Sequence, residues 1–113
     1  MQTLAFAAPI APGKTQIDRE NIASCASGER QAEYRASRER AGIRREAVWI
    51  QSTPGGDVGV ILIEAPDIQA AMGTLATSDD PFDSWFRENV KEVHGMDLTE
   101  GFAPPEQILD FNG

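Results

Sequence analysis

Residues 47–64, AVWIQSTPGGDVGVILIE, decide the fold of this chain. The two ends of this stretch are runs of β-branched and aromatic residues, and the middle is rich in Pro, Gly and Asp, which favour turns. The sequence therefore predicts a β-hairpin. Its second arm, Val58 to Glu64, is apolar on both faces, which is typical of a central strand covered on each side. Gly59 is expected to leave a gap on one of those faces.

The segment before the hairpin predicts a strand followed by a helix. Thr3 to Ile10 alternates along its length and stops at a cluster of proline and glycine. Thr15 then stands three residues before Asp18, the spacing of a capping box at a helix start. Apolar residues recur every three or four positions up to Gly42, and Gly28 is expected to kink or divide the helix.

The segment after the hairpin predicts two more helices and a last strand. Residues 66–77 have apolar positions at helical spacing, and Pro81 restarts the chain at a position that proline favours. The second of these helices, ending at Gly95, is the most amphipathic part of the chain. Its inward positions are Phe82, Trp85, Phe86 and Val93. Residues 99–113 are expected to form a C-terminal loop, with residues 108–111 as an edge strand.

The order of these elements predicts one α+β domain spanning residues 1–113. Strand, helix, strand, strand, helix pair and strand, joined by right-handed crossovers, give a ferredoxin-like βαββαβ fold with an antiparallel sheet and its helices on one face. The opposite face would expose the alternate apolar residues of the central strand to water. A homodimer that buries this face is therefore expected.

Composition narrows the classes of partner. Of the 113 residues, 41% are apolar and 25% are charged, as in ordinary folded domains. The net charge of −8 disfavours nucleic acid and anionic membrane surfaces, and no stretch approaches the roughly 20 apolar residues of a membrane span. Cys25 is the single cysteine and is expected to be an inert core thiol, so a reducing, cytoplasmic location is the simplest expectation.

One segment carries a family resemblance. Residues 77–95, TSDDPFDSWFRENVKEVHG, resemble second-helix segments in small bacterial members, of no agreed function, of the dimeric α/β-barrel superfamily, and the element order resembles that superfamily over nearly the whole chain. The resemblance implies two sheets stacked face to face. Better-known members include cofactor-independent monooxygenases of polyketide aromatics, polyketide cyclases, lactone isomerases, haem-degrading enzymes and ligand-sensing modules. Fold alone does not choose among these.

His94 is the first candidate for acid–base chemistry. Histidine is the side chain whose ordinary pKa lies nearest neutrality, and this chain has only one. The structural alternative is a histidine in the last helical turn, where its charged form complements the helix end. A third alternative comes from the resemblance, since some relatives use a helix histidine as an axial haem ligand.

Three further residues are candidates for substrate contacts. Trp49 lies in the middle of a strand and offers apolar area and an N–H group, although core or interface packing also explains it. Tyr34 and Arg38 are four residues apart on the first helix, so they could together hold an anionic or phenolic group. The alternative for this pair is a solvated helix flank.

Two function classes follow from these residues. The first is a cofactor-independent enzyme of monooxygenase or cyclase type that acts on a small hydrophobic or aromatic carbonyl compound. His94 would move the proton, Arg38 would stabilise negative charge, and Trp49 and Tyr34 would contact the substrate. The second is a non-catalytic small-molecule-binding or assembly domain. No metal is expected at the acidic cluster of Asp79, Asp80 and Asp83, because it stands at a helix start where capping explains two of the three carboxylates without a cation.

Overall fold

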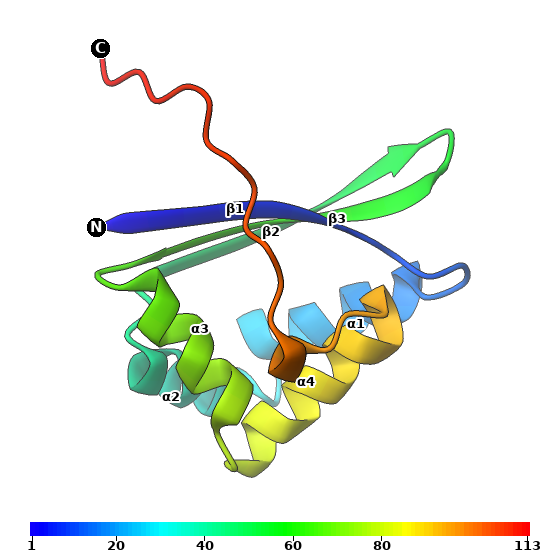
Figure 1. The fold of residues 1–113 in the computed structure, drawn as a ribbon. Helices are drawn as coiled ribbons and strands as arrows, with labels where there is room; N and C mark the ends of the chain where they lie inside the picture. Colours follow the sequence, from blue (N-terminus) through cyan, green and yellow to red (C-terminus); the bar gives the residue numbers. More distant parts are fainter.

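The computed structural model describes residues 1–113 as a three-stranded sheet and a layer of helices (Figure 1). The strands are β1 (Gln2–Pro9), β2 (Arg45–Thr53) and β3 (Gly56–Ala65). The helices are α1 (Thr15–Ala26), α2 (Gln31–Ala41), α3 (Ile68–Thr77), α4 (Pro81–His94) and the short 3-10 helix η1 (Leu98–Glu100). None of these helices combines the length and the apolar character needed to cross a membrane.

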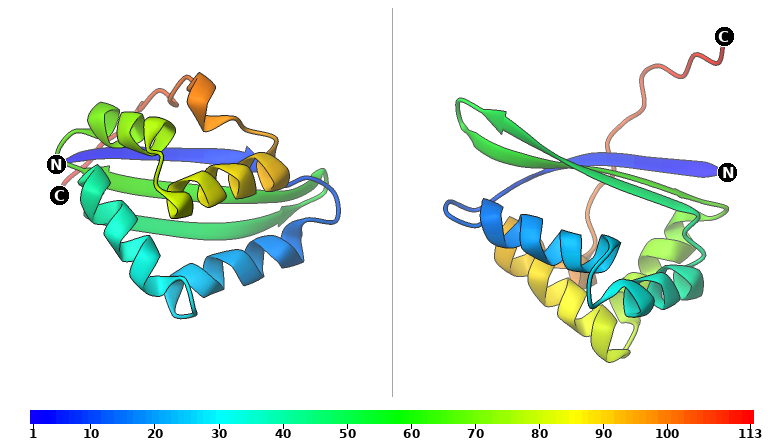
Figure 2. Two further views of the ribbon diagram at one scale, coloured as in Figure 1. Left: turned by 90° about the horizontal axis from the view of Figure 1, so that it is seen from below. Right: turned by 180° about the vertical axis from the view of Figure 1, so that it is seen from behind.

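All three strands pair antiparallel in the order β1-β3-β2, and the four α-helices lie on one side of the sheet (Figure 2). The predicted α+β class, antiparallel sheet and one-sided helical layer are confirmed. The element order is consistent with a ferredoxin-like fold. The predicted hairpin is also confirmed, with Ser52 opposite Asp57 and Thr53 opposite Gly56 at its turn.

The first predicted helix is divided, and its predicted capping box is wrong. α1 ends at Ala26 and α2 begins at Gln31, so the break falls around Gly28. Thr15 Oγ1 does not cap the helix but donates a hydrogen bond to Asp57 Oδ2 at 2.6 Å. This bond joins the start of α1 to the hairpin turn. Thr15 therefore donates to a carboxylate distant in the sequence and does not cap its own helix.

The predicted last strand at residues 108–111 is not formed. Residues 101–113 have no regular secondary structure, and the outer edge of β1 stays unpaired. Pro104 and Pro105 stand where the chain passes the start of β1. Proline has no backbone N–H to give to a strand ladder, so the chain leaves the sheet at this point.

The two faces of the sheet differ in cover. The helix-facing side carries the core, in which Leu4, Ile63 and Ala65 pack with Ala71 and Leu75 of α3. The other side, called the open face here, has no helical cover (Figure 2). The strand register places seven apolar residues on it, which are Ala5, Ala7, Ala47, Trp49, Val58, Val60 and Leu62.

Candidate functional site

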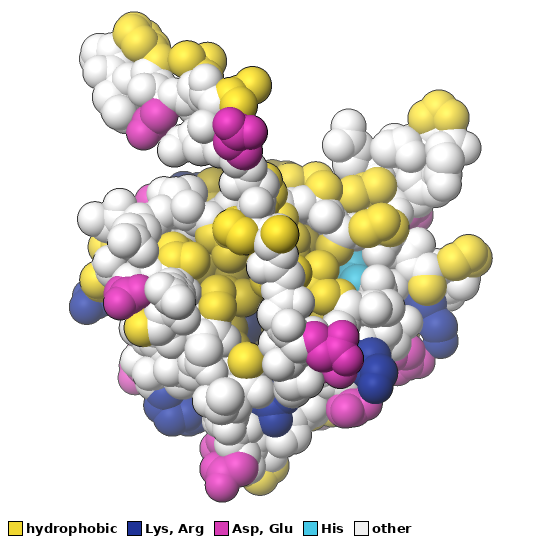
Figure 3. All heavy atoms as spheres, viewed as in Figure 1, with side chains coloured by type: hydrophobic (Ala, Val, Ile, Leu, Met, Phe, Trp, Pro, Cys, Tyr) yellow, Lys and Arg dark blue, Asp and Glu magenta, His cyan; other side chains and the backbone are white.

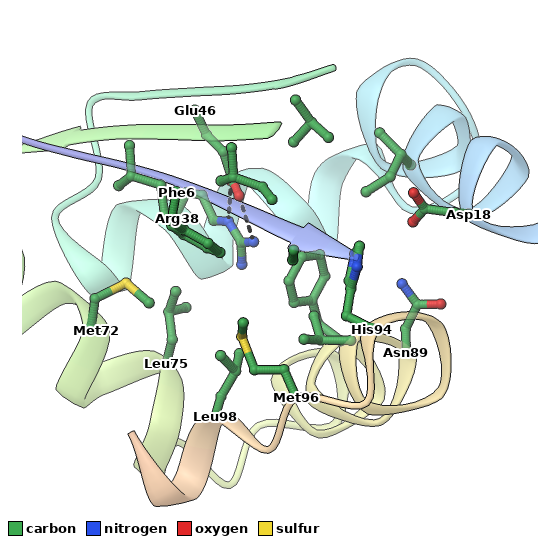
Figure 4. A pocket seen from close by; sticks show the side chains of 17 residues that line it. Phe6, Asp18, Arg38, Glu46, Met72, Leu75, Asn89, His94, Met96 and Leu98 are labelled. Carbon is green, nitrogen blue, oxygen red and sulfur yellow. Dashed lines mark hydrogen bonds and ion pairs between the residues drawn. The ribbon is translucent and has the colours of Figure 1, made fainter. Parts of the chain in front are cut away.

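A cavity lies between the helix-facing side of the sheet and helices α3 and α4 (Figure 4). Twelve of its seventeen lining residues are hydrophobic, so its walls suit an apolar or aromatic molecule. Phe6 and Ile61 line it from the sheet, Phe86 from α4, and Met96 and Leu98 from the segment after α4. The cavity volume of about 70 Å³ is about half of the roughly 150 Å³ of a cavity that binds benzene, so it suits a molecule of only a few heavy atoms.

One end of the cavity is formed by His94, Asn89 and Asp18 (Figure 4). His94 Nδ1 lies 3.0 Å from the carbonyl oxygen of Pro9. A carbonyl oxygen can only accept a hydrogen bond, so Nδ1 carries the hydrogen. The neutral imidazole therefore has an unprotonated Nε2 that can accept a proton.

Gly59 makes room for this imidazole. A Cβ atom added at residue 59 would lie 3.0 Å from His94 Cε1 and 3.7 Å from His94 Nε2. Any side chain at this position of β3 would therefore press on the ring. The gap that the sequence predicts at Gly59 is filled by His94, and it positions the ring at the end of the cavity.

Asp18 is a buried carboxylate without a protein hydrogen-bond donor. Its residue is only 3% exposed, no side chain or backbone N–H donates to its oxygens, and these oxygens keep a little solvent contact. Burial raises the pKa of Asp18, and the nearby His94 partly offsets this rise. Asn89 accepts a hydrogen bond from Asn21 Nδ2 at 2.6 Å, and its own nitrogen lies on the side of His94 (Figure 4).

Asp83 provides the contrast with Asp18. It is equally buried, but it accepts hydrogen bonds from Ser37 Oγ at 2.5 Å, Ser78 Oγ at 2.5 Å and Arg40 at 3.1 Å. Burial alone would raise the pKa of Asp83, yet these hydrogen bonds outweigh it and the pKa is lowered. Asp83 is thus a structural link between α2 and α4, whereas Asp18 keeps its hydrogen-bonding capacity for the cavity.

The other polar part of the cavity is a buried ion pair between Arg38 and Glu46. Arg38 Nε lies 2.8 Å from Glu46 Oε1, and the second nitrogen of the fork lies 3.3 Å from Glu46 Oε2. Tyr34 Oη donates to Glu46 Oε1 at 2.5 Å, which raises the pKa of Tyr34 together with its burial. Arg38 also donates to Ser37 Oγ at 3.0 Å.

The Arg38 guanidinium is held between two aromatic rings. Its carbon lies 4.3 Å from the centre of the Phe86 ring and 4.7 Å from that of Tyr34. Burial alone would lower the pKa of Arg38, but Glu46 and Tyr34 raise it, so the group stays charged. Three of its five N–H groups meet Glu46 and Ser37, which leaves two for a bound molecule.

The structure brings together most of the residues that the sequence predicts for a site. Arg38 and His94 line one cavity, and Tyr34 contacts Arg38. The solvated-flank alternative is wrong for Arg38, which is 5% exposed. Trp49 must be corrected, because the register places it on the open face, where it is 52% exposed and outside the cavity.

Asp18 and Glu46 are cavity residues that the sequence patterns did not predict. Ile22 follows Asp18 by four residues, and Cys25 follows Ile22 by three, so Asp18 stands on the apolar stripe of α1. A charged residue on that stripe was the signal that could have identified it. Glu46 stands two residues before Val48, so both lie on the helix-facing side of β2. A carboxylate in this apolar row was the corresponding signal for Glu46. Both residues stand at positions where an apolar side chain would be ordinary.

The structure also bears on the predictions for the acidic cluster, for Cys25 and for haem. Asp80 caps α4 through a hydrogen bond from the Phe82 N–H, so capping accounts for Asp80 and the links to α2 account for Asp83. Cys25 is buried, and burial raises the pKa of its thiol. The residues around His94 do not fit haem, because a cavity of about 70 Å³ is far smaller than a porphyrin.

Comparisons of the chain with protein-family models, curated proteins and solved structures found no match. The fold and the site define an α+β domain with a three-stranded antiparallel sheet and one layer of helices. Between the two layers it encloses an apolar cavity that carries a carboxylate–imidazole end and a guanidinium. The chemistry of these groups is therefore the basis for a functional assignment.

Proposed function

We propose that this domain is a cofactor-independent enzyme that removes a proton from a small hydrophobic carbonyl compound. The observation that carries the proposal is Asp18, a buried carboxylate without a hydrogen-bond donor beside His94. The Asp18 oxygens keep a little solvent contact, so they face the cavity rather than the closed core. A carboxylate whose pKa is shifted in such a place is typical of functional sites. The same cavity offers the unused N–H groups of Arg38 to a carbonyl oxygen.

The proposed step uses each polar group once. His94 Nε2 takes the proton from the carbon beside the carbonyl, and the electron pair of the broken C–H bond moves to the carbonyl oxygen as an enolate forms. The negative charge of Asp18 stabilises the imidazolium that is produced. Arg38 donates N–H groups to the enolate oxygen. Cyclisation and monooxygenation without cofactors can both start from such an enolate.

A non-catalytic small-molecule-binding domain is the second candidate. It is favoured by the ion pair of Arg38 with Glu46, which already compensates the positive charge in the cavity. In this case the cavity groups only orient a ligand. Substitution of His94 would then change the affinity for a small carbonyl compound without any effect on proton exchange.

Proton exchange with solvent tests the enzyme directly. In D₂O, we expect the protein to catalyse deuterium incorporation next to the carbonyl of acetone or butanone, followed by proton NMR. His94→Gln should slow this exchange by about 100-fold or more, the usual contribution of a general base. Asp18→Asn should also slow it, because the imidazolium loses its counter-charge.

Glu88→Gln is the matched control on the same helix, since Glu88 is exposed and lies outside the cavity. This variant should exchange at the wild-type rate. If neither compound exchanges faster than in buffer, or if His94→Gln leaves the rate unchanged, the enzymatic proposal is wrong. Binding of the same compounds without exchange would support the second candidate.

We also propose that two copies stack through their open faces, as the resemblance to the dimeric α/β-barrel superfamily implies. The seven apolar residues of this face have no cover within one chain. Arg45 and Glu64 are paired neighbours at one end of the face. A two-fold axis that runs parallel to the strands over β3 lays the apolar row of each copy against that of the other, so one self-association buries both rows.

Light scattering should therefore report a particle of two 12.3 kDa chains at micromolar concentration. Trp49→Lys places a charge at the centre of the open face and should give a folded monomer. Ile17→Lys is the control, because Ile17 is an exposed hydrophobic residue of α1 rather than of the sheet, and this variant should stay dimeric. A wild-type monomer under these conditions would contradict the stacked dimer.

A further inference from the structure

The C-terminal segment is the most exposed apolar part of the chain. Ile108, Leu109 and Phe111 are between 79% and 89% exposed, and they lie in an irregular tail that stands clear of the body (Figures 1 and 3). The tail crosses the edge of β1 and emerges on the side of the open face (Figure 1). Exposed apolar clusters of this kind mark interaction sites.

The start of the tail is anchored on its own domain, and its end is not. The Phe102 ring lies 4.9 Å from the Phe6 ring, on the helix-facing side of β1. Pro104 and Pro105 follow, and they cannot donate to the adjacent strand. The nine residue-to-residue steps from Phe102 to Phe111 can span at most about 30 Å. That reach takes the apolar end beyond its own β1 edge, to where a second copy on the open face would lie.

The outer edge of β2 offers a complementary surface. No strand pairs with this edge, and a groove of about 230 Å³ lies beside it between α2 and the start of β2. The groove is lined by four arginines and two glutamates, and the Arg38–Glu46 pair is neutral overall. Arg35, Arg44 and Arg45 outnumber the remaining acid, Glu39, so the groove is cationic on balance. The tail is acidic, with Glu106 and Asp110 beside its apolar residues, so the two surfaces have opposite charge.

We propose that the tail, residues 106–111, docks on the outer edge of β2 of a second copy of this chain. The inference rests on the stacked dimer of the proposed function. A two-fold axis parallel to the strands places the β1 edge of one sheet opposite the β2 edge of the other. The tail of each copy therefore emerges beside the outer edge of β2 of the other copy. The tail adds a strand there, as extended peptides do on free sheet edges, with its carboxylates against Arg44 and Arg45.

Cross-linking between two variants tests the arrangement. In a Cys25→Ala background, one chain carries Leu109→Cys and the other carries Ala47→Cys, and the mixture is treated with a short bismaleimide. A cross-linked pair of chains is expected from the mixture. A chain carrying both substitutions should also join to its partner; if it instead closes on itself and runs as a monomer, the tail docks on its own sheet and the inference is wrong.

Removal of the tail gives the energetic test. A chain that ends at Ala103 should dissociate at a concentration at least about tenfold higher, because the apolar side chains of the tail no longer leave water on dimerisation. Arg44→Glu should weaken the dimer as well, whereas Arg44→Lys should not. If the truncated chain dimerises as tightly as the full chain, the tail inference fails while the stacked dimer stands; if the full chain is monomeric, the dimer itself fails.

Discussion

Replacement of Arg38 by methionine is expected to destabilise the domain by about 3–5 kcal/mol, because it leaves the buried carboxylate of Glu46 without its cation. The side chains of this pair are only 6% and 10% exposed, and two hydrogen bonds join them. Arg38 also packs between the rings of Tyr34 and Phe86. Urea denaturation followed by tryptophan fluorescence measures the effect.

The double variant Arg38→Met/Glu46→Gln separates the charge from the packing. It removes both charges, so it should regain most of the stability that the single variant loses. Lys14→Met is the matched control at an exposed ion pair, Lys14 to Glu92 at 3.0 Å, and it should cost at most about 1 kcal/mol. If Arg38→Met costs no more than this control, the pair is not the buried ionic centre described above.

Phe82→Ala is expected to cost a similar amount, about 3–5 kcal/mol, through lost burial and an unfilled cavity. Phe82 is 4% exposed at the first turn of α4. Its ring centre lies 5.6 Å from that of Trp85, 6.1 Å from Phe86 and 6.4 Å from Tyr34, so it joins α4 to α2. Thermal and urea unfolding should both show the loss.

The comparison with His94→Ala makes this prediction sharper. That variant removes one hydrogen bond, from Nδ1 to the Pro9 carbonyl, and should cost only about 0.5–1.5 kcal/mol. Phe82→Leu should be milder than Phe82→Ala because it refills part of the space. A larger loss in His94→Ala than in Phe82→Ala would mean that the imidazole, rather than the aromatic cluster, holds α4 in place.

The strands and helices up to residue 95 were largely predictable from the sequence, because local chemistry specifies them. The turn residues 53–57 fix the hairpin, and Pro81 and Gly95 mark the ends of α4, with Gly95 in the left-handed conformation that favours glycine. The last strand was not predictable in this way. Residues 108–111 have strand-like composition, but strand formation requires a partner edge, and the two prolines before them direct the chain away from β1.

The candidate site was predictable only in part. Arg38 and His94 were identified from residue type and spacing, but the burial of Arg38 depends on Glu46, which β2 brings against α2. Asp18 reaches the cavity only because α1 packs beside the end of α4. Such contacts between distant elements leave almost no trace in the local sequence. The face of the sheet on which Trp49 lies was also not predictable, because a shift of one residue in strand register would move it to the other face.

The titration of Asp18 tests the central claim, which is that this buried carboxylate and His94 form the unpaired polar centre of the cavity. Carboxyl carbon NMR across pH should give Asp18 a pKa above its ordinary value of 3.8, because burial disfavours the charged form. Asp57, whose pKa is lowered by hydrogen bonds from Thr15 and Ser52, is the internal control. In His94→Gln the pKa of Asp18 should rise further, since the positive neighbour that lowers it is gone. A pKa of Asp18 at or below 3.8 that does not respond to His94→Gln would contradict the account.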